Sequence, residues 1–140
     1  MSDLDLLTAV LTDEHAAVYA YGALGARLDS PTRAVALAAF DDHRRARDDV
    51  TTRLRAAGRR PPGPLPSYDV AVRGRADALV LAVRIEVALG VRWRDLVGGT
   101  TDPTLRRAGV AGLQACAVRA ATWRLTAGTS PATTALPGAV

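Results

Sequence analysis

Hydrophobic residues in two long stretches of the chain recur at alternating steps of three and four residues. In the first stretch the series occupies positions 4, 7, 11, 14, 18, 21, 25 and 28, and in the second 36, 40, 43, 47, 50, 54 and 57, and most of these positions carry apolar residues. Such spacing puts one stripe of side chains along a helix, which then packs against other helices at a shallow angle. Similar series continue through residues 79–93 and 105–123. The pattern therefore predicts an all-α bundle of four long helices.

Proline and glycine residues mark the ends of these helices. Ser30-Pro31 and Asp102-Pro103 each combine an N-cap residue with proline at the first helical position, which is typical of a helix start. Gly58 and Gly128 suit left-handed caps at helix ends. We expect helices over about residues 3–28, 31–57, 75–97 and 103–127, which gives one bundle domain over 1–128 and a flexible C-terminal tail over 129–140.

A proline-rich segment, residues 59–74, separates the second and third helices. Its run Pro61-Pro62-Gly63-Pro64-Leu65-Pro66 excludes a helix. At ~3.1–3.3 Å per residue the segment can span about 50 Å, whereas a helix of about 24 residues is about 36 Å long. It can therefore cross the whole bundle, so that the third helix starts beside the start of the second. We expect this long crossover, although a loop of this length could also hang at one end.

Composition bears on partners and compartment. All 18 basic residues are arginine, the formal net charge is +4, and aromatic residues make up 4% of the chain. The arginines are scattered in pairs and few rings are present for base stacking, so we do not expect a nucleic-acid surface. The lone Cys116 excludes a disulfide framework. Since neither a signal-peptide pattern nor a membrane-spanning apolar run is present, we expect a cytoplasmic protein with no membrane partner.

Five ionisable residues interrupt the apolar stripes near the middle of the helices: Glu14, His43, Arg47, Glu86 and Arg119. A buried charge must be paired or bind a metal, because desolvating it alone costs several kcal/mol. One interpretation is an ion-pair network in which Arg47 and Arg119 neutralise Glu14 and Glu86, with His43 as a hydrogen-bond partner. The other is a metal site with Glu14, His43 and Glu86 as ligands. Tyr21, two turns after Glu14, is expected to pack in the core and hydrogen bond through its hydroxyl.

Three segments give a resemblance to a known family: Glu14–Gly25, His43–Asp48 and Val118–Arg124. The arrangement resembles the ferritin-like superfamily, and these segments resemble an actinobacterial ferritin-like family of unknown function. The resemblance covers about residues 4–127. It implies a ferritin-like four-helix bundle without supplying an activity.

Di-iron members of that superfamily use one glutamate on each of two helices and a Glu-x-x-His pair on each of the other two. Under this resemblance Glu14 and Glu86 match the single glutamates. The second helix keeps His43 but has phenylalanine in place of its glutamate, and the fourth has cysteine and Arg119. About half of the ligand set is therefore lost, and a fixed cation takes the place of a second metal, which disfavours metal binding electrostatically.

The sequence thus predicts a ferritin-like bundle whose degenerate di-iron site is replaced by a buried Glu/His/Arg network, with no metal or cofactor and a non-catalytic binding or structural role. Alanine-rich helix faces would allow a homodimer. The alternative is a metal-binding or oxidoreductase relative with a single iron, manganese or zinc ion on Glu14, His43 and Glu86. A nucleic-acid-binding bundle is a third class.

Overall fold

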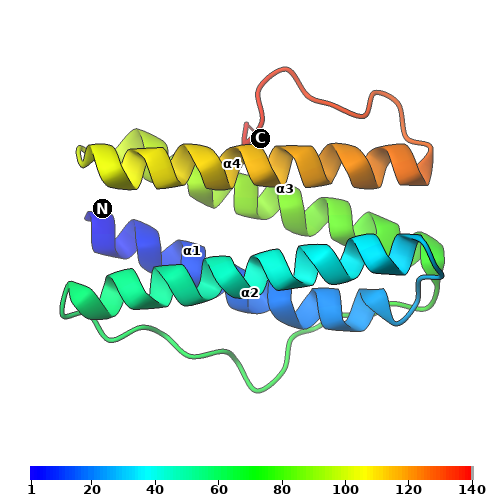
Figure 1. The fold of residues 1–140 in the computed structure, drawn as a ribbon, viewed down its shortest axis with the longest axis horizontal. Helices are drawn as coiled ribbons and strands as arrows, with labels where there is room; N and C mark the ends of the chain where they lie inside the picture. Colours follow the sequence, from blue (N-terminus) through cyan, green and yellow to red (C-terminus); the bar gives the residue numbers. More distant parts are fainter. Residues whose placement is uncertain (140) are drawn as a thin grey trace.

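Four α-helices account for most of the chain. The structure, a computed structural model, describes residues 1–139. The helices are α1 (Asp3–Gly25), α2 (Thr32–Ala56), α3 (Arg75–Gly99) and α4 (Pro103–Ala127), and residues 1–139 contain no strand. All four lie side by side along one long axis (Figure 1). The predicted all-α four-helix bundle is confirmed, and the expected helix bounds agree to within about three residues.

The segment between α2 and α3 runs along the whole bundle (Figure 1). Near the start of α1, Arg59 Nη1 lies 3.3 Å from Asp5 Oδ1. Further along the same helix, the ring of Tyr68 packs 5.2 Å from the ring of Tyr19 between centroids. Because later residues of the segment contact later residues of α1, the segment follows α1 from its start toward its end. The long crossover is thus confirmed, and α2 and α3 run in the same direction.

The helix ends follow local sequence signals in most places. The Asp102 carboxylate accepts the backbone N–H of Thr104 at 2.7 Å, so the predicted start of α4 is confirmed. Gly58 and Gly128 have φ of +76° and +73°, as a left-handed helix cap requires.

The predicted N-cap at Ser30 is wrong. Pro31 occupies the N-cap position of α2, and no side chain caps this end. The reason is a turn that starts earlier, because the Asp29 carbonyl already accepts the N–H of Arg33 at 2.9 Å. Ser30 therefore lies inside that turn, and its side chain forms no capping hydrogen bond to α2.

The interior consists of two apolar clusters with polar side chains between them. One cluster lies toward the start of α1 and the other toward its end. Three buried charged residues belong to neither cluster and lie between the two: Glu14, His43 and Glu86. The largest members are Trp93, Leu11, Leu54 and Leu96 in the first cluster, and Trp123, Tyr21, Leu24 and Leu28 in the second. The apolar stripes of the sequence therefore form the core, and the residues that interrupt them form its middle layer.

The C-terminal tail folds back along the bundle. Residues 129–139 contain no helix, and Figure 1 shows them returning from the end of α4 toward the middle of the molecule. Val140 lies outside the described residues. The predicted flexibility of the tail stays a prediction. Within residues 1–139, none of the helices combines the length and hydrophobicity of a membrane-spanning segment.

Candidate functional site

His43 lies between two glutamates in the centre of the bundle. Its Nδ1 atom is 2.8 Å from Glu14 Oε2, and its Nε2 atom is 3.0 Å from Glu86 Oε1. The three residues come from the middle of α2, α1 and α3, and none is more than 1% exposed. Because both ring nitrogens face carboxylate oxygens, the ring donates two hydrogen bonds when it carries two protons. The arrangement therefore favours an imidazolium ion held between two carboxylates.

The fourth helix contributes a guanidinium group. Arg119 Nε donates a hydrogen bond to Glu86 Oε2 at 3.0 Å, and Arg119 Nη1 lies 3.5 Å from Asp42 Oδ2 on α2. The Arg119 side chain is 19% exposed, so it reaches from the buried glutamate to the surface. In formal charge, the two buried carboxylates balance the imidazolium and the guanidinium. The buried Glu/His/Arg network predicted from the sequence exists.

Two aromatic side chains complete the network. The Tyr21 hydroxyl donates to Glu86 Oε1 at 2.5 Å, and Trp123 Nε1 donates to the Tyr21 hydroxyl at 2.7 Å. Glu86 is therefore the acceptor for three residues, His43, Arg119 and Tyr21. Among the described residues, no buried side-chain nitrogen or oxygen lacks a hydrogen-bond partner. A fully satisfied polar network of this kind fixes the relative positions of the helices that supply it.

Sequence reasoning missed the position of Tyr21 and Trp123 in this network. It predicted a hydroxyl hydrogen bond for Tyr21, but it did not identify Glu86 as the acceptor. The available signal was the stripe itself, because Tyr21 lies two turns after Glu14 on the same face of α1, and Trp123 lies one turn after Arg119 on α4.

Arg47 was also predicted in the network, and this prediction is wrong. Its guanidinium binds the neighbouring Asp48, with Nη2 2.8 Å from Oδ1, and its side chain is 26% exposed. Position 47 follows His43 by one helical turn, but a long arginine side chain can carry its charge outward to water. Since His43 and Arg119 already supply the cations of the core, Arg47 is not needed there.

The charges of the network stabilise one another. Burial disfavours the charged form of His43, but hydrogen bonds and charges of Glu14 and Glu86 outweigh it and raise the pKa of His43 to about 9. Burial likewise disfavours the carboxylate of Glu86, yet His43 and Arg119 lower its pKa below the usual value. Burial and the nearby Glu86 charge raise the pKa of Cys116, so its thiol stays neutral and unreactive at physiological pH.

This donor arrangement does not suit a metal ion. An imidazole binds a metal through a nitrogen lone pair, and here both nitrogens of His43 are used in hydrogen bonds to carboxylates. Within residues 1–139, no group of three or more histidine, cysteine, aspartate or glutamate side chains is arranged to hold a metal. What the site can do chemically is to hold a proton and fixed charges in the buried core.

These pKa shifts predict a stability maximum in mildly acidic solution. A group whose pKa is raised on folding stabilises the fold fully below its unfolded pKa, here about 6.5, and this contribution is lost as pH rises through about 9. At roughly 1.4 kcal/mol per pKa unit, His43 accounts for a loss of about 3 kcal/mol over that range. Glu86 acts oppositely, because its contribution is lost as pH falls below its usual pKa of 4.5. Urea unfolding at steps from pH 4 to 9 measures this profile, and a flat profile between pH 6.5 and 9 would contradict the charged His43.

Comparisons with known proteins place the chain in a family. Residues 6–140 match the family described as a domain of unknown function (DUF4439). A search of curated proteins found no match. Among solved structures, the chain is similar to the crystal structure of a conserved hypothetical protein, Rv2844, from Mycobacterium tuberculosis. The two share 32% sequence identity with a TM-score of 0.85, over 89% of this chain and 96% of the other. The chain therefore belongs to the DUF4439 family of domains of unknown function.

Proposed function

We propose that this chain is a ferritin-like protein in which the buried Glu/His/Arg network stands in place of a di-iron centre, and that it acts without a metal as a non-catalytic binding or structural protein. The long crossover and the mid-helix positions of Glu14, His43 and Glu86 support the ferritin-like assignment, because the superfamily builds its metal site from inward-facing residues at such positions.

The observation that carries the proposal is the double hydrogen bond of His43. A ligand histidine of a metal site keeps one ring nitrogen for the metal and uses the other to bind a carboxylate or carbonyl. In this chain each nitrogen has its own carboxylate, at 2.8 and 3.0 Å. Arg119 adds a cation 3.0 Å from Glu86, which raises the cost of placing a metal ion beside the same carboxylate. The charges of the site are thus balanced without a metal.

Metal analysis of the purified protein tests this proposal. Protein prepared without chelator, and then dialysed against iron(II), manganese(II) or zinc(II), is expected to retain less than about 0.1 equivalent of each metal after desalting, since three of the six di-iron ligands are absent. Inductively coupled plasma mass spectrometry gives the amounts. About one equivalent that disappears in Glu86→Ala but persists in Asp13→Ala, which removes a carboxylate outside the network, would support the mononuclear alternative and overturn the proposal.

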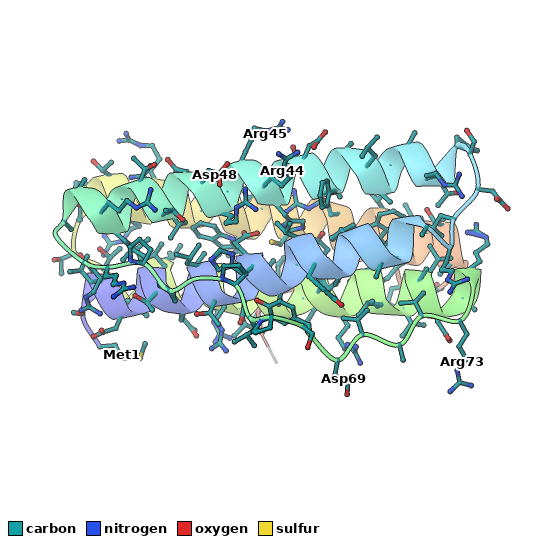
Figure 2. All side chains as sticks on the ribbon, turned by 90° about the horizontal axis from the view of Figure 1, so that it is seen from below. Met1, Arg44, Arg45, Asp48, Asp69 and Arg73 are labelled. Carbon is teal, nitrogen blue, oxygen red and sulfur yellow. The ribbon has the colours of Figure 1, made fainter. Side chains whose placement is uncertain are left out.

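The surface arginines support a role without nucleic acid. On α2, Arg45 binds Asp42, and Arg44 Nη1 lies 3.6 Å from Asp41 Oδ1. Figure 2 shows Arg44 and Arg45 on the same helix as Asp48, which binds Arg47. On this helix the acidic partners therefore interrupt the arginines, which do not form an uninterrupted stripe for phosphates. Retention on duplex DNA that weakens steeply with salt would contradict this part of the proposal.

Compartment and assembly complete the proposal. We place the protein in the cytoplasm, because its lone cysteine is free and buried. A homodimer would cover apolar side chains that the bundle leaves at its surface, such as Leu37 on α2, 60% exposed, and Leu125 on α4, 69% exposed. Sedimentation analysis of the intact chain distinguishes a dimer from a monomer.

A further inference from the structure

The C-terminal tail is attached to the bundle at two points. Arg124 Nη1 on α4 donates to the Ala132 carbonyl at 3.3 Å, and Arg94 Nη1 on α3 donates to the Gly138 carbonyl. Gly138 has φ of +82° and lies so close to α3 that a Cβ atom there would be 3.0 Å from the Gly90 carbonyl oxygen. Only glycine suits both this conformation and this approach. The tail therefore forms a strap from α4 to α3 across the surface of the bundle.

A cavity of about 330 Å³ lies beneath this strap. Its helical walls include Gly90 on α3 and Ala117 and Ala121 on α4, and Thr134 and Pro137 of the tail cover it. Alanine and glycine at several positions on the helical side leave part of the space between tail and helices unfilled, and larger aliphatic side chains complete its apolar wall. The volume corresponds to about eleven water molecules in the liquid. It lies at the lower end of the range for small-molecule sites, which are mostly apolar with a few placed polar groups.

The polar groups of the cavity differ in what they can offer a ligand. At its inner end Glu86 already accepts from His43, Tyr21 and Arg119, so it has no free charge to present. The raised pKa of Cys116 leaves a neutral thiol beside it. Arg124 differs, because it forms no ion pair with any residue in 1–139 and uses one N–H on the tail. The cavity thus combines an apolar interior with one guanidinium that has no acidic partner in the described chain.

We propose that this cavity binds a small aliphatic carboxylate of about ten to twelve non-hydrogen atoms, with its chain between α3, α4 and the tail and its carboxylate on Arg124. A guanidinium binds a carboxylate through two parallel N–H···O bonds, and the alkyl chain replaces water against alanine and glycine surfaces. This site specifies a ligand for the binding role proposed above and rests on that role. The two fail separately, because metal content tests the network and carboxylate binding tests the cavity.

Calorimetric titration of the full chain with decanoate and with decan-1-ol tests the site. We expect saturable 1:1 binding of decanoate, and at least about tenfold weaker binding in Arg124→Gln, since the variant loses the charge-assisted hydrogen bonds to the carboxylate. Arg107→Gln removes an arginine of the same helix outside the cavity and should leave binding unchanged. Decan-1-ol has no charge and should bind the wild-type chain and Arg124→Gln with equal affinity.

A second variant tests the location. Ala117→Leu places a larger side chain in the cavity and is expected to abolish binding of decanoate and decan-1-ol alike, while helical circular dichroism and the two-state unfolding transition persist. Three results would overturn the proposal: no saturable decanoate binding to the wild-type chain, equal decanoate affinity in wild type and Arg124→Gln, or undiminished binding in Ala117→Leu.

Discussion

Replacing His43 by leucine is expected to destabilise the protein by at least about 4 kcal/mol at pH 7, because breaking a buried ion pair leaves an uncompensated charge. In the wild-type chain the ring separates Glu14 from Glu86 and donates to both. Leucine has a similar volume, so the expected loss comes from two carboxylates left without their shared cation and not from a cavity. The free energy of unfolding from urea titration measures the effect.

The other histidine supplies the control for this prediction. His15 on α1 is half-buried against the crossover, with Nε2 3.0 Å from the Pro62 carbonyl oxygen, so His15→Leu should cost about 1 kcal/mol. If His43→Leu fails to fold, adding Glu14→Gln should recover a folded bundle, because Glu86 keeps Arg119 as its counter-ion and the carboxylate left without a cation is removed. A loss below about 1 kcal/mol in His43→Leu, or no recovery in the double variant, would contradict the charged network.

Replacing Arg119 by methionine is expected to cost about 3 kcal/mol, the lower end of the range for a broken buried pair. Glu86 loses one of its donors but keeps His43 and Tyr21, and the 19% exposure of Arg119 lets some water reach the site. Methionine keeps an apolar stem of similar length, so packing changes little. Unfolding free energies at pH 7 again give the magnitude.

Arg47→Met is the matched control for Arg119→Met. Both arginines occupy mid-helix positions, but Arg47 binds only the exposed Asp48, an interaction that contributes about 0–1 kcal/mol. The Arg119 variant should also show a smaller acid-side loss of stability, because Arg119 helps to lower the pKa of Glu86. Equal losses in the two variants would mean that the aliphatic stems, and not the Arg119–Glu86 pair, stabilise the bundle.

The fold follows from signals that are local in the sequence. Steps of three and four residues define one face of a helix whatever packs against it, and Asp102-Pro103 fixes the start of α4 through groups within one turn. The crossover follows from chain length, because a proline-rich segment of this reach can connect opposite ends of the bundle. The prediction of an N-cap at Ser30 was wrong, because the turn that leads into α2 begins before it, at the Asp29 carbonyl.

A site residue could be predicted from the sequence only where its position on the helix alone decides whether its side chain points into the core. Glu14, His43 and Glu86 have side chains short enough that their seam positions place their polar atoms in the core. Arg47 has such a position too, but its side chain is long enough to reach either the core or solvent. Which of the two it reaches depends on neighbours on other helices. The bond from Tyr21 to Glu86 depends on how α1 and α3 are aligned. The cavity beneath the tail could not be predicted from the sequence, because alanine and glycine that line a cavity look the same in the sequence as those that let two helices pack closely.

The crossover divides the chain into two helical hairpins, α1–α2 and α3–α4, and this division has a consequence for folding. Each hairpin carries one acid and one base of the network: Glu14 and His43 in the first, Glu86 and Arg119 in the second. Contacts within a hairpin are local in sequence and form quickly, whereas docking of the hairpins must wait for the long connection to close. Each hairpin can thus neutralise its own charges before docking. The hydrogen bonds of Glu86 with His43 and Tyr21 then join two electrically neutral halves and select their register.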